Sequence, residues 1–258
     1  MVARELERPV TTGAFRRVRI YNGVMGILHA AQAVAVLALA NDFALPVTGS
    51  FLQGPPGTPS AEPATLFRIS VAWGVAVFFF LSAAAHWTAV APGVSSWYRR
   101  NLERGRNYLR WTEYALSASL MVVLIAMLTG ISDMAALVAI FGVNAAMILF
   151  GLVQEHYEPP GGSMLPFWLG SLVGAVPWLA IGVYLWAPGS VAEPPGFVYA
   201  IFFSLFVFFN SFALNMWLQY RQIGRWRSYL YGESVYILLS LTAKSALAWQ
   251  VFASTLAG

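Results

Sequence analysis

Seven long apolar stretches divide the chain and constrain what it can fold into. Each could cross the hydrocarbon core of a bilayer, which takes a helix of about 20 residues. Backbone polar groups inside lipid must bond within their own segment, so such stretches favour helices. Only 10% of the residues are charged, whereas an average soluble domain has about 25%. The sequence therefore predicts an all-α membrane protein, a seven-transmembrane helix bundle forming one domain over residues 1–258. The expected spans are 14–40, 65–90, 102–130, 133–156, 164–187, 195–222 and 229–256.

The first connection, residues 41–63, is unusually long for a link between two helices and is rich in proline and glycine. Loops of this length are commonly structured or functional. Residues 44–47 and 50–53 flank Thr48 and Gly49, a dipeptide that suits a tight turn. We expect a short β-hairpin in this loop.

The arginines indicate the orientation in the membrane, because cytoplasmic loops carry an excess of positive charge. Thirteen of them lie before the first span, around the second-to-third connection or in the sixth-to-seventh connection. These three segments lie on one side of a seven-span chain. The opposite side has only Arg68. The sequence thus predicts a multi-pass protein of the cell membrane, with a cytoplasmic N-terminus and an extracellular C-terminus.

The last span contains the residue that most strongly indicates a function. Between Ser234 and Gly258 the only charged residue is Lys244, which is also the only lysine of the chain. An ionisable group inside a bilayer is costly and commonly functional. A buried lysine can lose its proton and condense with an aldehyde to form a Schiff base. The alternative is a lysine that pairs with a buried carboxylate only to hold helices together.

Glu113 is the expected partner of Lys244, since it is the only carboxylate that we place well inside a span. Measured from the outer ends of their spans, Glu113 lies about 26 Å deep and Lys244 about 18 Å deep. Helical side chains tilt toward the N-terminus, so the lysine points toward the level of Glu113. Glu113 could instead pair with Arg110, one helical turn away.

Polar residues at helical spacing indicate a pocket around this pair. Ser240 lies four residues before Lys244 and Ser117 four residues after Glu113, each on the same helical face as its neighbour. His29, Gln32 and His86 lie in the first two spans and suggest a hydrated proton cavity. Such histidines could also serve only as packing hydrogen-bond partners.

Aromatic residues could form a flat apolar slot for a ligand. The candidates are Trp178, Trp249 and the phenylalanines of the span 195–222, among them Phe209; Asn144 is the polar candidate in the fourth span. Most phenylalanines must nonetheless face lipid or pack in the core. With no cysteine there is no thiol nucleophile or Cys-based metal site, and the arginines flank membrane spans, so nucleic acid is not an expected partner.

Seven spans, a lysine in the seventh and Arg110-Trp111-Thr112-Glu113 in the third resemble the microbial rhodopsins. The inverted orientation and five further stretches resemble one branch, the heliorhodopsins. The stretches are Asn-Asp-Phe-Ala-Leu-Pro (41–46), Gly-Pro-Pro-Gly-Thr (54–58), Ile-Phe-Gly-Val-Asn-Ala (140–145), Phe-Phe-Asn-Ser-Phe-Ala-Leu (208–214) and Ala-Lys-Ser-Ala-Leu-Ala-Trp (243–249).

The resemblance implies all-trans retinal on Lys244 as a protonated Schiff base, with Glu113 as its counterion. It also implies a cytoplasmic-side cavity that involves His29 and His86, and a homodimer to which the loop 41–63 contributes. The implied activity is light sensing, with an unknown cytoplasmic signalling partner and no enzymatic reaction.

Two positions differ from the pumping rhodopsins. Those proteins usually have an aspartate four residues before the lysine, where this chain has Ser240. Outward proton pumps have a carboxylic donor eleven residues after the counterion, where this chain has Leu124. We therefore expect a photoreceptor without sustained ion pumping. The alternatives are a light-driven proton transporter or channel, and a membrane enzyme with a lysine imine, for which a second acid–base set is lacking.

Overall fold

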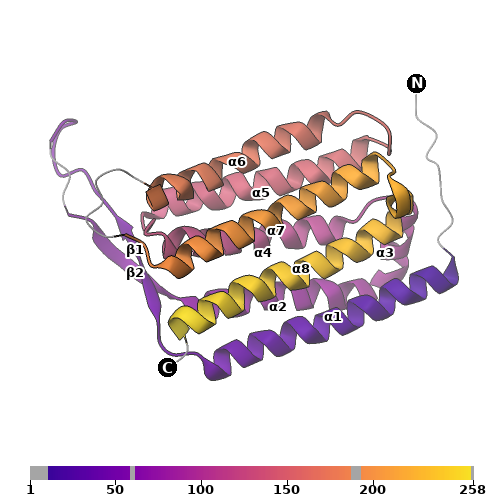
Figure 1. The fold of residues 1–258 in the computed structure, drawn as a ribbon, viewed down its shortest axis with the longest axis horizontal. Helices are drawn as coiled ribbons and strands as arrows, with labels where there is room; N and C mark the ends of the chain where they lie inside the picture. Colours follow the sequence, from indigo (N-terminus) through magenta and orange to yellow (C-terminus); the bar gives the residue numbers. More distant parts are fainter. Residues whose placement is uncertain (1–10, 59–61, 187–192, 257–258) are drawn as a thin grey trace.

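Seven long helices form one bundle in the structure, a computed structural model that describes residues 11–58, 62–186 and 193–256 (Figure 1). This agrees with the predicted seven-span helical fold. The spans are α1 (Thr12–Leu39), α2 (Val71–Val90), α4 (Tyr108–Leu128), α5 (Met134–Tyr157), α6 (Leu165–Trp186), α7 (Gly196–Tyr220) and α8 (Tyr229–Val251). A 3-10 turn η1 (Gly224–Arg227) precedes α8, and a π-helical turn η2 (Phe252–Leu256) continues it.

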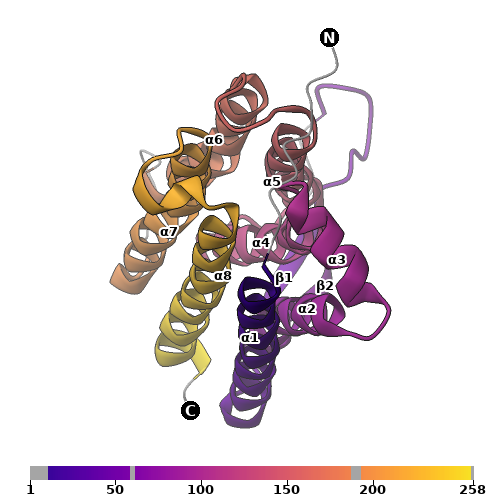
Figure 2. The same ribbon diagram turned by 90° about the vertical axis from the view of Figure 1, so that its right-hand side faces the viewer.

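Helix α4 lies at the centre of the bundle, with the other spans around it (Figure 2). Its most apolar stretch is more buried than that of any other span in the described part of the chain. Val122, Leu124 and Ile125 in its second half are inaccessible or nearly so. Because α4 contacts several helices at once, polar residues on α4 can reach partners on different spans.

The third expected span, 102–130, begins later than expected, because residues 102 and 103 end a separate short helix and α4 starts at Tyr108. The short helix α3 (Val94–Glu103) ends before Gly105, which has a left-handed backbone (φ 70°) that favours glycine. Asn107 then caps α4, with its side-chain oxygen 3.1 Å from the backbone N–H of Arg110. A turn signal followed by an N-cap thus separates α3 from the membrane span.

The first connection contains a two-stranded antiparallel sheet, but the predicted hairpin has the wrong second strand. Strand β1 (Ala44–Gly49) pairs with β2 (Ala64–Ser70), while residues 50–53 form no strand. Because β2 uses residues 64–70, α2 begins at Val71 and not near residue 65. The other five spans begin and end within two residues of the expected bounds, apart from the π turn that ends the last one.

Strand β1 is fastened to the turn between α4 and α5. The backbone N–H of Thr48 donates to the Ser132 carbonyl at 2.8 Å, and the two hydroxyls are 2.9 Å apart. The sheet therefore lies at the end of the bundle where α4 finishes and α5 starts (Figure 1).

The two ends of the bundle differ in charge. Among the described residues, every arginine except Arg68 belongs to the end where α1, α4 and α8 begin, which we call the arginine-rich end; Arg4 and Arg8 lie outside the described residues. Arg68 is on β2, and its guanidinium donates to the Ala44 carbonyl at 2.5 Å. The opposite end, with β1 and β2, is called the ribbon end below.

Close packing of α4 against α5 depends on Gly151. A Cβ atom there would overlap the ring of Trp111, whereas one at Gly142 on the same helix would meet nothing within 4 Å. Gly151→Ala should therefore lower the free energy of unfolding by about 1–3 kcal/mol, the usual cost of overpacking. Gly142→Ala is the matched control and should be neutral or slightly stabilising. Thermal unfolding of the two variants in detergent, followed by tryptophan fluorescence, tests this; equal midpoints would contradict the described contact.

Candidate functional site

Lys244 lies on α8 with a side chain only 3% exposed. Its ammonium Nζ is 3.2 Å from Oε1 of Glu113 and donates to the Ser240 hydroxyl at 2.8 Å. The ring of Tyr114 lies on a further side, with its centroid 5.2 Å from Nζ. A buried cation needs such a counter-charge and acceptor, because it has lost its water.

Glu113 meets Lys244 from the central helix α4. Its side chain is 7% exposed, and the Ser82 hydroxyl on α2 donates to Oε1 at 2.6 Å. The same carboxylate oxygen thus faces both the lysine and a serine. The structure brings together the two residues that the sequence pairs by depth, and it adds Ser82, which the sequence analysis did not single out.

A cavity of about 270 Å³ begins at Lys244. Its walls come from five helices and are mainly aromatic or aliphatic, with few polar groups. The residues that line it include Tyr114, Trp178, Phe209, Tyr236, Ser240 and Lys244. Trp178 lies edge-on to the rings of Phe202, Phe206 and Phe209, with centroids 5.3–5.4 Å away. The space is suited to an elongated apolar molecule attached or anchored at the lysine.

Only some of the expected pocket residues line this cavity. Ser117 and Asn144 are fully buried elsewhere; Asn144 donates to the Ser119 hydroxyl at 3.0 Å, and the Ser117 hydroxyl has no partner. Trp249 is 37% exposed on the outside of α8. Helical spacing assigned these residues to a span but could not tell which face of the helix meets the cavity.

The three residues expected to form a polar cavity, His29, Gln32 and His86, do not all lie together in the structure. His29 and His86 stack with ring centroids 5.3 Å apart, and His86 Nδ1 is 2.8 Å from the Asn22 side-chain oxygen. Both ring nitrogens of the fully buried His29 lack a partner. Gln32 does not join them. Its side-chain oxygen accepts hydrogen bonds from Ser245 and Trp249 between α1 and α8.

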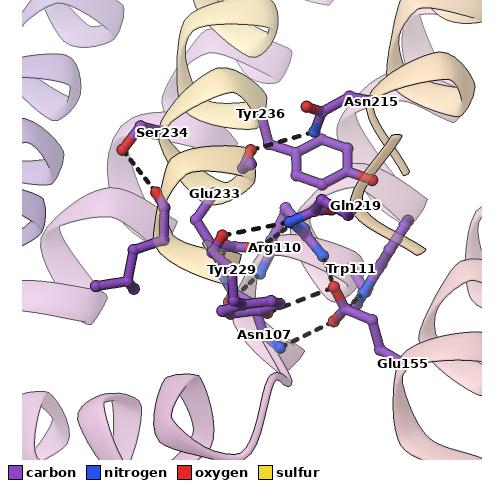
Figure 3. Close-up of polar contacts among 12 residues, drawn as sticks. Asn107, Arg110, Trp111, Glu155, Asn215, Gln219, Tyr229, Glu233, Ser234 and Tyr236 are labelled. Carbon is purple, nitrogen blue, oxygen red and sulfur yellow. Dashed lines mark hydrogen bonds and ion pairs between the residues drawn. The ribbon is translucent and has the colours of Figure 1, made fainter. Parts of the chain in front are cut away.

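Arg110 does not pair with Glu113, the alternative partner considered from the sequence. Its guanidinium bonds to Glu155 on α5 and to Glu233 on α8, and lies over the rings of Trp111 and Tyr236 (Figure 3). Glu155 and Glu233 are themselves buried, so Glu113 is not the only carboxylate inside the spans. We call Arg110, Glu155, Glu233 and their hydrogen-bond partner Asn107 the arginine cluster.

The sequence contained a signal for this cluster. Glu155 closes one apolar stretch and Glu233 opens another, both at the arginine-rich end, and Arg110 stands inside a predicted span. Charges at span ends are normally assigned to the aqueous boundary. A buried arginine, however, requires carboxylate partners, and these two were available at the same level.

The bundle also resembles a solved protein. The chain is similar to the crystal structure of thermophilic rhodopsin, with a TM-score of 0.62 and 14% identity over 94% of each chain. Identity this low shows the fold alone. Fold and site together define a seven-helix membrane protein of the rhodopsin type, with one lysine beside a carboxylate at a buried cavity.

The family is defined by the sequence comparison. The heliorhodopsin family model matches residues 18–256, so the chain belongs to the heliorhodopsin family. This confirms the resemblance found in the sequence, and it supports a retinal-binding rhodopsin. No curated protein matches the chain.

Loss of Arg110 should strongly destabilise the bundle. Arg110→Gln removes the cation that both buried glutamates contact, and breaking a buried ion pair typically costs about 3–5 kcal/mol. Arg99→Gln is the control, because the Arg99–Glu103 pair is about one third exposed and exposed pairs contribute roughly 0–1 kcal/mol. Denaturant or thermal unfolding in detergent gives both values. A variant at Arg110 as stable as the control would show that the cluster does not stabilise the fold.

Proposed function

We propose that this chain is a light-sensing retinal protein in which Lys244 carries all-trans retinal and Glu113 is the counterion. The observation that carries the proposal is the sole lysine, buried at the end of an apolar cavity and 3.2 Å from a carboxylate. Membership of the heliorhodopsin family implies the same chromophore.

The residues at the cavity fit retinal. A long polyene needs a narrow apolar channel, and Trp178 with Phe209 provides flat walls beside the lysine. Retinal, when bound, supplies absorption of visible light and isomerisation. The few polar groups of the cavity wall include Ser240 next to Lys244, which fits a ligand with one polar end.

Glu113 supplies the negative charge that balances the cationic nitrogen of Lys244. A carboxylate beside a cationic nitrogen favours its charged form, so Glu113 would keep the nitrogen of Lys244 protonated in the dark. Ser82 donates to the same carboxylate oxygen and fixes its direction. A proton that leaves the nitrogen has Glu113 as its first acceptor.

Groups that can receive a proton after Glu113 lie toward one side. Glu113 itself lies in the second turn of α4, near the arginine-rich end, and His86 lies on the last turns of α2 at the same end. Beyond Lys244 toward the ribbon end, the described residues of α4 and α8 include no carboxylate, histidine or basic side chain, and Leu124, Leu247 and Val251 are fully or nearly fully buried. We propose that the proton moves toward the arginine-rich end and returns by the same route, and that no ion is pumped.

A light-driven proton transporter or channel is the second candidate. The buried and chemically unpartnered ring nitrogens of His29 favour it, because such a group can take part in a proton path. It would need a second protonatable group on the ribbon side of Lys244. We propose no enzymatic reaction for the site.

The colour of the protein tests the chromophore assignment. Lys244→Ala, expressed with added retinal, should give a folded but colourless protein because the chain has no other lysine side chain for an imine. Glu113→Gln should stay coloured but shift its absorption, and should lose colour with base at a lower pH than the parent, because the charged nitrogen has lost its counter-charge. Absorption spectra and pH titrations measure both. A visible band in Lys244→Ala would refute the attachment site.

The absence of pumping is tested on illuminated cells. Since the described spans show no chain of carboxylates or histidines from one end of the bundle to the other, light should cause no sustained pH change that an uncoupler abolishes. His29→Ala and His86→Ala should instead change the rates of the photocycle intermediates in flash spectroscopy. A sustained acidification or alkalinisation sensitive to an uncoupler would establish transport and overturn the photoreceptor proposal.

We further propose that the arginine-rich end is cytoplasmic, that the ribbon end is extracellular, and that the ribbon contributes to a homodimer. The arginine asymmetry supports the first part. The homodimer is supported by exposed apolar side chains at Phe51, Leu52, Leu66 and Phe67, because they offer a surface for a copy of the chain. A signalling partner would then meet the arginine-rich face.

The chain has no cysteine, so a single introduced one reports on both proposals. Ser50→Cys at the ribbon should react with a membrane-impermeant maleimide on intact cells, and an oxidant should cross-link it into a dimer. Ser96→Cys on α3 at the opposite end is the control and should react only after lysis. The reverse labelling would overturn the orientation, and a ribbon cysteine that never cross-links would argue against the ribbon as the dimer contact.

A further inference from the structure

The arginine cluster has an unbalanced charge if both of its carboxyl groups are ionised. Arg110 contributes one positive charge, and Glu155 and Glu233 would contribute two negative ones. The three side chains are 5%, 3% and 0% exposed, so water cannot compensate for the excess. Arg110 is the one cation that faces Glu233 in the described part of the chain. An uncompensated charge at such a place is strongly unfavourable.

Glu155 has the surroundings of an ionised carboxylate. Its oxygens accept from the guanidinium of Arg110, the backbone N–H of Asn107 at 3.0 Å and the indole N–H of Trp111 at 2.7 Å. The hydroxyl of Tyr229 lies 3.4 Å away as a fourth donor. Several donors on one carboxyl group favour its charged form. Figure 3 shows these groups converging on Glu155 from α4 and α8.

Glu233 has fewer donors and no access to water. It accepts from Arg110 and from the Asn107 side-chain amide at 2.6 Å, and the Tyr229 hydroxyl near Glu155 is also a donor to it. The other ionisable groups that face it are Glu155 on α5, Tyr98 on α3, Tyr114 on α4, and Tyr229 and Tyr236 on its own helix. The hydroxyl of Tyr98 is neutral, because burial and the neighbouring Glu233 raise its pKa. A tyrosine hydroxyl is either neutral or negative, so none of these groups can balance the charge of a second carboxylate.

We infer that the arginine cluster is a second proton-binding site and that Glu233 holds this proton in the resting protein. One proton on Glu233 leaves Arg110 paired with a single ionised carboxylate and removes the excess charge. The inference concerns the dark protein and does not depend on retinal. It places a protonated acid on the same helix as Lys244, next to an arginine that is one turn from Glu113.

Infrared spectroscopy of the purified full-length protein at neutral pH tests the inference, because a protonated carboxylic acid has its own carbonyl-stretch band. Wild-type protein should show this band. Glu233→Gln should lose it, and Glu233→Asp should shift it. Glu155→Gln should also lose it, since Arg110 and Glu233 alone balance each other and Glu233 then ionises. Glu158→Gln at the same end is the matched control and should keep the band, as should Glu113→Gln.

Stability gives a second measurement. Glutamine has the shape of a protonated glutamate, so Glu233→Gln should unfold at nearly the wild-type temperature. A wild type without the band, or a band that survives in Glu233→Gln or in Glu155→Gln, would overturn the inference. So would a band shifted by Glu155→Asp but not by Glu233→Asp, which would place the proton on Glu155. A strongly destabilised Glu233→Gln beside an intact Glu155→Gln would also overturn it.

Discussion

The ion pair between Lys244 and Glu113 is the interaction on which the rest of the site depends. Both groups are removed from water, and neither could remain charged there without the other. The pair joins α8 to the central helix α4, and Ser82 extends it to α2. These buried contacts together hold three spans around the only lysine of the chain, which lines the cavity.

Helix α4 carries two charged groups, three residues apart, that serve different partners. Glu113 faces Lys244, whereas Arg110 reaches Glu155 and Glu233. The tyrosines connect the two sites. Tyr114 donates to the Tyr236 carbonyl at 2.8 Å, its ring lies near Lys244, and the ring of Tyr236 stacks on Arg110. A change in charge at the lysine can thus alter the contacts of the arginine cluster through neighbouring packed rings.

The positions of residues that depend only on the nearby sequence could be predicted. Lys244 stands out because it is the only charge in a long apolar stretch, and its pairing with Glu113 follows from the helical rise and the tilt of side chains. Ser240 follows from the spacing of four residues. The faces on which Ser117, Asn144 and Trp249 lie were not predictable, because all sides of these spans are apolar and give no periodicity.

Features that depend on distant partners escaped the sequence analysis. Strand β2 was missed because its partner β1 is about twenty residues away, and the nearby Thr48–Gly49 offered an apparently complete hairpin. Glu155 and Glu233 were missed because each lies at the end of an apolar stretch, where a charge is unremarkable alone. Their burial is caused by Arg110, which reaches both from the middle of the bundle.

The uneven distribution of polar groups supports the proposal that the site responds to light without moving an ion across the membrane. Glu113, His86 and the arginine cluster lie between Lys244 and the arginine-rich end. Toward the ribbon end, the described residues of α4 and α8 include no carboxylate, histidine or basic side chain, and aliphatic residues such as Leu124 and Leu247 are buried there. A proton displaced toward the polar side meets groups that can accept it, whereas one displaced toward the ribbon end meets a barrier. Under the proposal, the charge rearranges at the arginine-rich end, where α3 and the connection before α8 lie.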